Sequence, residues 1–87
     1  MIYLNNENIV IPNLLGIDSS SYRLVLKNNV TNEYFTLDAS NLSDNELYYK
    51  FNIDASSMAN NEYTITLYND SSVFLGEYLA QKGINKM

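Results

Sequence analysis

The residues of this chain that could do acid–base or metal chemistry are its carboxylates, because the chain contains no His and no Cys. The absence of His and Cys excludes a Ser–His–Asp triad, thiol catalysis and zinc–thiolate sites. The nine serines form no Gly-x-Ser-x-Gly elbow, and no EF-hand type calcium-binding loop is present. We therefore expect no catalytic centre, no metal site and no cofactor.

The aspartates are explained by turn formation. Asx side chains accept hydrogen bonds from nearby backbone N–H groups, so they concentrate where strands end. Glycoside chemistry would need two carboxylates flanking a substrate cleft, and 87 residues leave little room for one. The aspartates expected at or near turns are Asp18, Asp38, Asp44, Asp54 and Asp70.

The charge distribution argues against a nucleic-acid partner. The chain carries a formal net charge of -5, and its five basic residues are scattered along the sequence. Phosphate backbones are bound by clustered Lys and Arg, and nucleotides by clustered glycines. Neither kind of cluster is present, so we expect no nucleic-acid or nucleotide partner.

Aromatic residues are the better candidates for function. The chain has eight Tyr and three Phe, and strand alternation sends several of them to the face opposite the core. Exposed Tyr offers rigid contact area that suits protein interfaces, although it could also stack on sugars or only stabilise cross-strand pairs. The candidate partner-binding residues are Tyr34, Tyr48, Tyr68 and Phe74, with Tyr3 as a further candidate.

Short alternating runs must position these aromatic residues. Apolar and polar side chains alternate with a period of two over residues 21–27, 33–39, 46–54, 61–69 and 73–81, which predicts strands. Gly76 interrupts the last run and indicates a bulge. We expect Leu47 to face the core and Leu42 to close one end of it. The other predicted core residues are Leu24, Leu26, Phe35, Leu37, Tyr49, Phe51, Ile53, Tyr63, Ile65 and Leu67.

The length predicts a single domain over residues 1–87. Residues 1–12 are expected to form a first strand pair or one broken edge strand that ends at Pro12, and residues 83–87 a short tail. No secretory leader and no run of about 20 apolar residues is seen. We therefore expect a protein that is made and kept in the cytosol and binds no membrane.

The polar corner between the runs 46–54 and 61–69 is most informative about the fold. Tyr63 follows Asn60 and Asn61 and lies five residues after Met58. In a tyrosine corner the hydroxyl bonds back to backbone a few residues upstream, an arrangement typical of immunoglobulin-like sandwiches. The alternative is that Tyr63 is an ordinary inward-facing aromatic residue. We predict an all-β fold, a single immunoglobulin-like β-sandwich of about six to eight short antiparallel strands.

The corner Met58–Tyr68, the preceding Tyr48–Ile53 and the strand containing Gly76 resemble small Ig-like virion proteins of Bacteroides-infecting, crAss-like tailed phages. That family includes capsid decoration proteins and head-fibre attachment domains. Its corner usually reads Leu-x-x-Gly-Glu-Tyr, whereas here Met58 replaces the leucine and Asn61 the glycine. Asn tolerates the positive φ of such a turn.

The resemblance, which covers roughly residues 20–82, implies a non-enzymatic auxiliary capsid protein located in the virion. Its expected partner is the major capsid protein or a head-fibre protein. An unpaired sheet edge would also allow a homo-oligomer.

Two other functions stay open from the sequence. A ligand-binding module, such as a carbohydrate-binding or adhesin-type β-sandwich, would use the same aromatic residues, although such modules usually belong to longer secreted chains. An enzyme inhibitor or anti-defence protein is the other alternative.

Overall fold

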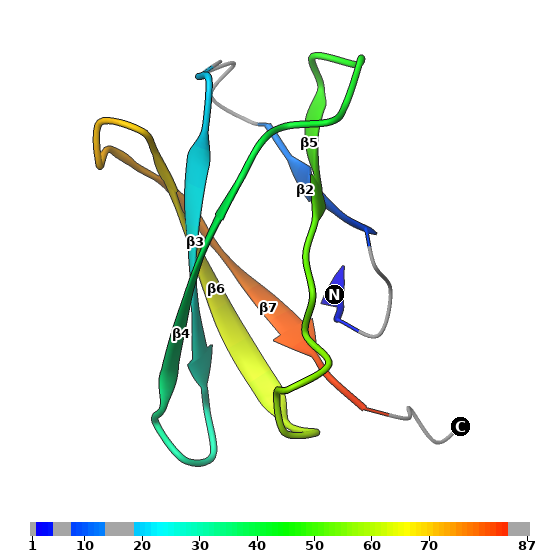
Figure 1. Ribbon diagram of the computed structural model, residues 1–87, viewed down its shortest axis with the longest axis vertical. Helices are drawn as coiled ribbons and strands as arrows, with labels where there is room; N and C mark the ends of the chain where they lie inside the picture. The colour runs from blue at the N-terminus through cyan, green and yellow to red at the C-terminus, as the bar shows by residue number, and fades with distance from the viewer. Residues whose placement is uncertain (1, 5–7, 14–18, 84–87) are drawn as a thin grey trace.

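The computed structural model describes residues 2–4, 8–13 and 19–83, which contain seven strands and no helix. The strands form two sheets (Figure 1). The larger sheet has five strands in the order β1-β7-β6-β3-β4, and the smaller sheet pairs β2 with β5. The protein is therefore all-β, as predicted. The strands are β1 Ile2–Tyr3, β2 Asn8–Pro12, β3 Tyr22–Asn28, β4 Tyr34–Ala39, β5 Tyr48–Asn52, β6 Glu62–Asn69 and β7 Phe74–Gln81.

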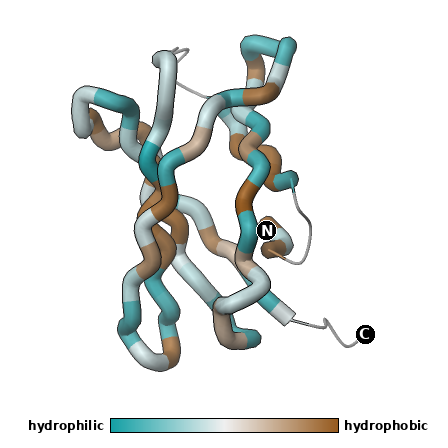
Figure 2. The backbone as a smooth tube through the Cα atoms, in the orientation of Figure 1, coloured by the Kyte–Doolittle hydropathy of each residue, from teal (hydrophilic) through white to brown (hydrophobic). Residues whose placement is uncertain are grey.

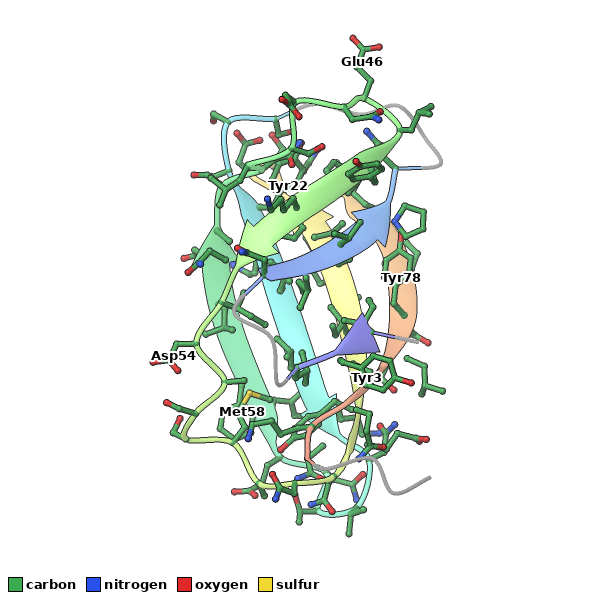
Figure 3. The ribbon with its side chains drawn as sticks, turned by 90° about the vertical axis from the view of Figure 1, so that its right-hand side faces the viewer. Tyr3, Tyr22, Glu46, Asp54, Met58 and Tyr78 are labelled. Atoms are coloured by element: carbon green, nitrogen blue, oxygen red, sulfur yellow. The ribbon has the colours of Figure 1, made fainter. Side chains whose placement is uncertain are left out.

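The two sheets face each other across one hydrophobic core, and Figure 3 shows the smaller sheet lying in front of the larger one. Tyr22 of β3 contacts Tyr49 and Phe51 of β5, with ring centroids 4.9 Å and 5.4 Å apart. Aromatic packing thus joins the layers. The buried apolar residues are Leu4, Ile9, Ile11, Tyr22, Leu24, Leu26, Tyr49, Phe51, Ile53, Ala55, Met58, Tyr63, Ile65, Leu67, Leu75 and Ala80.

Period-two alternation decides which side chains enter this core. Figure 2 shows hydrophobic and hydrophilic residues alternating along the strands of the larger sheet. Of the twelve residues predicted to face or close the core, eight are buried, Phe35 and Leu37 are half-buried against it, and Leu42 and Leu47 are exposed. Phe35 and Leu37 belong to β4, an edge strand that the two-stranded sheet covers incompletely.

The N-terminal segment differs from the prediction. β1 pairs with β7 and β2 pairs with β5, so the two runs join different sheets and form neither a strand pair nor one broken strand. The β1–β7 pair is also parallel, so the strands are not all antiparallel. Pro12 ends β2 as expected for a residue without an N–H group. Residues 84–87 of the predicted tail lie outside the described residues.

Two leucines that we expected in the core are exposed. Leu47 is 75 % exposed and Leu42 is 55 % exposed. The Asn45 side-chain oxygen accepts the Leu47 N–H at 2.8 Å, so the chain is still turning at Leu47 and β5 begins one residue later. Leu42 runs beside β5 instead, with its N–H donated to the Lys50 carbonyl at 2.7 Å. The alternation of a strand therefore does not extend into the preceding turn.

A bulge in β7 lies where Gly76 predicts it. Leu67 pairs with Gly76 but Tyr68 pairs with Phe74, so Leu75 is an extra residue in the ladder. A Cβ at position 76 would lie 2.5 Å from the Tyr78 hydroxyl, so the glycine leaves room for that ring. The Tyr78 hydroxyl donates to the Pro12 carbonyl at 3.3 Å and so links the two sheets (Figure 3). Partial burial of this side chain raises the pKa of Tyr78.

The aspartates divide between turns and a strand. Asp54 accepts the Ser56 N–H at 3.0 Å in the crossing from β5 to β6, which is the predicted turn bond. Asp38 lies one residue before the predicted end of β4 at Ala39, where it forms an ion pair with Arg23 at 3.4 Å. Asp18 lies outside the described residues.

Candidate functional site

Tyr63 lies at the start of β6, where the chain enters the larger sheet from the smaller one. Its side chain is fully buried, and its hydroxyl donates to the carbonyl oxygen of Ala59, four residues upstream, at 2.8 Å. This is the hydrogen bond that a tyrosine corner requires. Met58 is also buried in this crossing (Figure 3). The corner therefore positions the sheets relative to each other.

Asn60 and Asn61 tie the corner to the end of β7. Lys82 donates its backbone N–H to the Asn61 carbonyl at 2.9 Å and its ammonium group to the Asn60 side-chain oxygen at 3.4 Å. Among the described non-glycine residues, positive φ occurs only at Asn32 and Ser72. Asn61 therefore does not use the left-handed conformation that would explain its replacement of a glycine.

A buried polar residue, Asn28, completes the corner. Its side-chain amide donates to the Tyr63 hydroxyl oxygen at 3.3 Å, and its side-chain oxygen accepts the N–H groups of Val30 and Thr31 at 2.9 Å and 3.2 Å. Asn28 was not among the predicted core residues, yet it continues the inward-facing series of β3 at a spacing of two. A polar residue that extends an apolar strand face is the signal that could have identified it.

The outer face of the larger sheet carries an aromatic pair. Tyr68 of β6 and Phe74 of β7 are cross-strand partners, with ring centroids 6.2 Å apart and an interplanar angle of 72°. Phe74 is 55 % exposed, and Tyr68 is half-buried. Arg23 is the cross-strand neighbour of Tyr68 on β3. Aromatic residues beside an arginine are typical of binding hot spots, and we call these three residues the aromatic patch.

Tyr34 lies on the same outer face but apart from the aromatic patch. It is 65 % exposed and projects from β4 beside Lys27 of β3. Lys27 in turn pairs with Thr64 of β6, which lies four residues before Tyr68 on that strand. Tyr34 therefore lies toward the opposite end of the face.

Tyr48 lies on the smaller sheet, where it pairs with Pro12. Its neighbour Tyr49 points into the core, so Tyr48 points to the outer face of the smaller sheet. This face lies across the core from the aromatic patch. The partner-binding candidates Tyr48 and Tyr68 therefore lie on the outer faces of different sheets and do not form one surface, because alternation distinguishes inward from outward side chains but does not specify the sheet.

Two further apolar side chains extend the outer face of the larger sheet. Leu79 is 46 % exposed and pairs with Thr64, and Tyr3 is 42 % exposed and pairs with Gln81. Leu79 was not predicted as a contact residue, although it alternates with the buried Ala80. With Tyr34, Tyr3 and the aromatic patch, the outer face of the larger sheet carries most of the aromatic residues that the sequence offers as partner-binding candidates.

No group of three or more metal-ligating side chains occurs in the part of the chain that the structure describes. No helix in that part is long and apolar enough to cross a membrane. Comparison of the chain with protein-family models, curated proteins and solved structures found no match.

Proposed function

We propose that this protein is a non-enzymatic structural protein that binds other protein subunits through the aromatic patch. The Tyr68–Phe74 pair carries the proposal, because it presents a large aromatic contact area on the sheet, beside Arg23. Side chains held on strands lose little conformational entropy when they bind. The arginine adds hydrogen-bond donors for acidic or carbonyl groups of the partner.

The proposed partner is the capsid of a tailed phage, on which the chain acts as an auxiliary decoration protein through the major capsid protein or a head-fibre protein. The support is the resemblance of residues 20–82 to small virion proteins of crAss-like phages. We also propose an Ig-like sandwich, since two facing sheets are joined by the Tyr63–Ala59 corner bond.

Mass spectrometry of virions purified from the phage that encodes the chain tests this function. We expect the protein in amounts comparable to those of other capsid components, retained after washing in high salt. Its absence from intact, washed virions would overturn the assignment to the capsid.

Substitution of Tyr68 and Phe74 by Ser tests the surface. Loss of two aromatic hot-spot residues is expected to lower the affinity for capsids lacking the protein by roughly tenfold to a hundredfold or more, measured by co-sedimentation. Tyr48→Ser is the matched control, since Tyr48 lies on the outer face of the other sheet. If the Y68S/F74S variant binds as well as the wild type, or if Y48S loses binding, this surface is rejected.

Carbohydrate binding is the second candidate, because the exposed Phe74 ring could stack on a sugar. The interplanar angle of 72° argues against it, since the two rings form no flat platform. A glycan array with the wild type and the Y68S/F74S variant distinguishes the two functions. A glycan signal that disappears in the variant, joined to absence from virions, would favour the carbohydrate module.

A further inference from the structure

The outer edge of β4 is open, and Asp38 is the one charged side chain that it carries. β4 forms one end of the larger sheet and pairs with β3 in regular register along its whole length (Figure 3). Natural edge strands are commonly blunted by Lys, Pro, a bulge or an inward-pointing charge. The sequence Tyr34-Phe-Thr-Leu-Asp-Ala39 has no Lys, Pro or bulge, and its single charge, Asp38, points outward and is paired with Arg23.

The other strand edges among the described residues are obstructed, interrupted or, at the two-residue β1, too short to offer a regular edge. On β5, the Lys50 carbonyl accepts the Leu42 N–H at 2.7 Å and the Lys50 N–H is donated to the Asn41 side chain at 2.9 Å. β2 ends in Pro12, which has no N–H to donate. β7 is interrupted by its bulge and is partly covered by β1. Within this part of the chain, β4 is the strand that offers a regular, continuous edge.

The phase of the β3–β4 ladder shows which backbone groups face that edge. The Asn28 N–H is donated to the Glu33 carbonyl at 2.8 Å. Because hydrogen-bonded pairs alternate along an antiparallel ladder, the odd-numbered residues of β4 direct their N–H and C=O groups toward β3. The even-numbered residues Tyr34, Thr36 and Asp38 direct theirs toward the open edge.

We infer that β4 pairs antiparallel with β4 of a second copy of this chain, so that two larger sheets become one continuous sheet. The register that uses all three outward residues places Thr36 opposite Thr36, and Tyr34 opposite Asp38 on both sides. Each of these three pairs would then exchange two hydrogen bonds. If the β4–β4 register is shifted by one residue, side chains that face each other point to opposite faces of the sheet. If it is shifted by two residues, one of the three hydrogen-bonded pairs is not formed.

The inner faces fit this register. Phe35 and Leu37 point inward but are only half-buried. With Thr36 at the centre, Phe35 of one copy lies beside Leu37 of the other, twice by symmetry. The pairing therefore extends the hydrophobic core across the junction and removes exposed apolar area at the incompletely covered edge.

Charge complementarity on the outer face favours a second copy over an arbitrary strand. Asp38 lies beside Arg23 of its own chain, to which it is paired at 3.4 Å. Across the junction it faces Tyr34 of the second copy, whose own cross-strand neighbour is Lys27. Each Asp38 carboxylate thus lies between Arg23 of its own chain and a neutral tyrosine of the second copy, and no like charges are cross-strand partners along the two paired strands. This pairing leaves the Tyr68–Phe74 pair free and does not depend on the proposed capsid function.

Charge substitutions at Thr36 test the register, because this residue would lie opposite itself. Sedimentation velocity of the purified wild-type chain should show a dimer whose population rises with concentration. Thr36→Lys and Thr36→Glu should each abolish the dimer through like-charge repulsion, and an equal mixture of the two variants should restore it. The matched controls Thr66→Lys and Thr66→Glu lie on the same outer face at the centre of the sheet, away from the edge, and should dimerise like the wild type.

Hydrogen exchange of the unmodified protein gives a second readout. The amides of Tyr34, Thr36 and Asp38 should become protected as the protein concentration rises, whereas those of Phe35 and Leu37 should be protected at all concentrations. A wild type that stays monomeric, or a Thr36→Lys variant that dimerises normally, would overturn the inference. If the mixture of the Thr36→Lys and Thr36→Glu variants fails to associate, the symmetric register is rejected, whereas recovery of the dimer in that mixture supports it.

Discussion

At the scale of single residues, the Tyr63 hydroxyl joins three segments of the chain. It donates to Ala59 in the crossing at 2.8 Å and accepts from Asn28 at the end of β3 at 3.3 Å, and the side chains of Tyr63 and Asn28 are both buried. Among the described residues, no buried side-chain nitrogen or oxygen lacks a hydrogen-bond partner. The network therefore offsets the desolvation cost of burying an amide and a phenol in an apolar core.

Tyr63→Phe should destabilise the protein by about 1 to 3 kcal/mol, because the Ala59 carbonyl and the Asn28 amide each lose a partner. Urea denaturation followed by circular dichroism measures the change. Tyr68→Phe is the matched control, since its hydroxyl bonds no described residue, and it should shift stability by about 0.5 kcal/mol or less. Equal stability of the two variants would show that the corner bond contributes nothing.

At the scale of elements, the crossing from β5 to β6 is built on a single turn. The Met58 N–H is donated to the Ala55 carbonyl at 3.0 Å, and the Asp54 carboxylate accepts the Ser56 N–H at 3.0 Å. The turn delivers Ala55 and Met58 to the core while Asp54 stays exposed (Figure 3). So short a segment could not form a stable helix, and these two hydrogen bonds hold it as a single turn.

The Asp54 turn should make stability depend on pH. Hydrogen bonds from the Ser56 side chain and backbone lower the pKa of the Asp54 carboxyl below its ordinary value of 3.8. Because the pKa of Asp54 is lower in the folded state than in the unfolded state, the ionised carboxylate contributes fully to folding stability above its ordinary pKa. This contribution is lost as the pH falls through the folded-state pKa. The stability difference between wild type and Asp54→Ala should therefore narrow below about pH 4.

Denaturant midpoints measured at a series of pH values between neutral and strongly acidic conditions check this expectation. Asp54→Asn is the control, because it keeps a side-chain acceptor but does not titrate, so its difference from Asp54→Ala should not vary with pH. If the stability difference between the wild type and Asp54→Ala is also independent of pH, the ionised carboxylate does not have the proposed role.

At the scale of the whole molecule, two unequal sheets are held together by side chains that meet between them. Phe51 of β5 is fully buried, and its ring centroid lies 5.4 Å from that of Tyr22 in the opposite sheet and 5.8 Å from that of Tyr49. A two-stranded sheet has little stability of its own. The smaller sheet therefore depends on this contact with the larger one.

Phe51→Ala should cost about 3 to 5 kcal/mol, the usual effect of deleting a buried aromatic side chain. A domain of this size has a total stability of roughly 4 to 13 kcal/mol, so a large share of it would be lost. Thermal and urea denaturation measure the effect, with the outward-facing Tyr48→Ala on the same strand as control. A loss below about 1 kcal/mol for Phe51→Ala would mean that the sheets do not depend on this residue.

Local features of the fold can be predicted from the amino-acid sequence alone. Alternation of apolar and polar residues identified β3, β4, β5, β6 and β7 and the residues that face inward along them, because a strand turns successive side chains to opposite sides. Gly76 indicated the bulge. The spacing before Tyr63 indicated the corner whose hydroxyl bond is made to Ala59.

Which strands are neighbours, and which surfaces they form, depends on long-range strand pairing. Alternation carries no information about the partner of a strand, so β1 and β2 join different sheets and Tyr48 lies across the core from Tyr68. The ion pair of Asp38 with Arg23 depends on the β3–β4 register. The half-burial of Phe35 and the open edge of β4 arise because one sheet has five strands and the other has two. These are properties of long-range pairing and of sheet size, and a local period of two residues specifies neither.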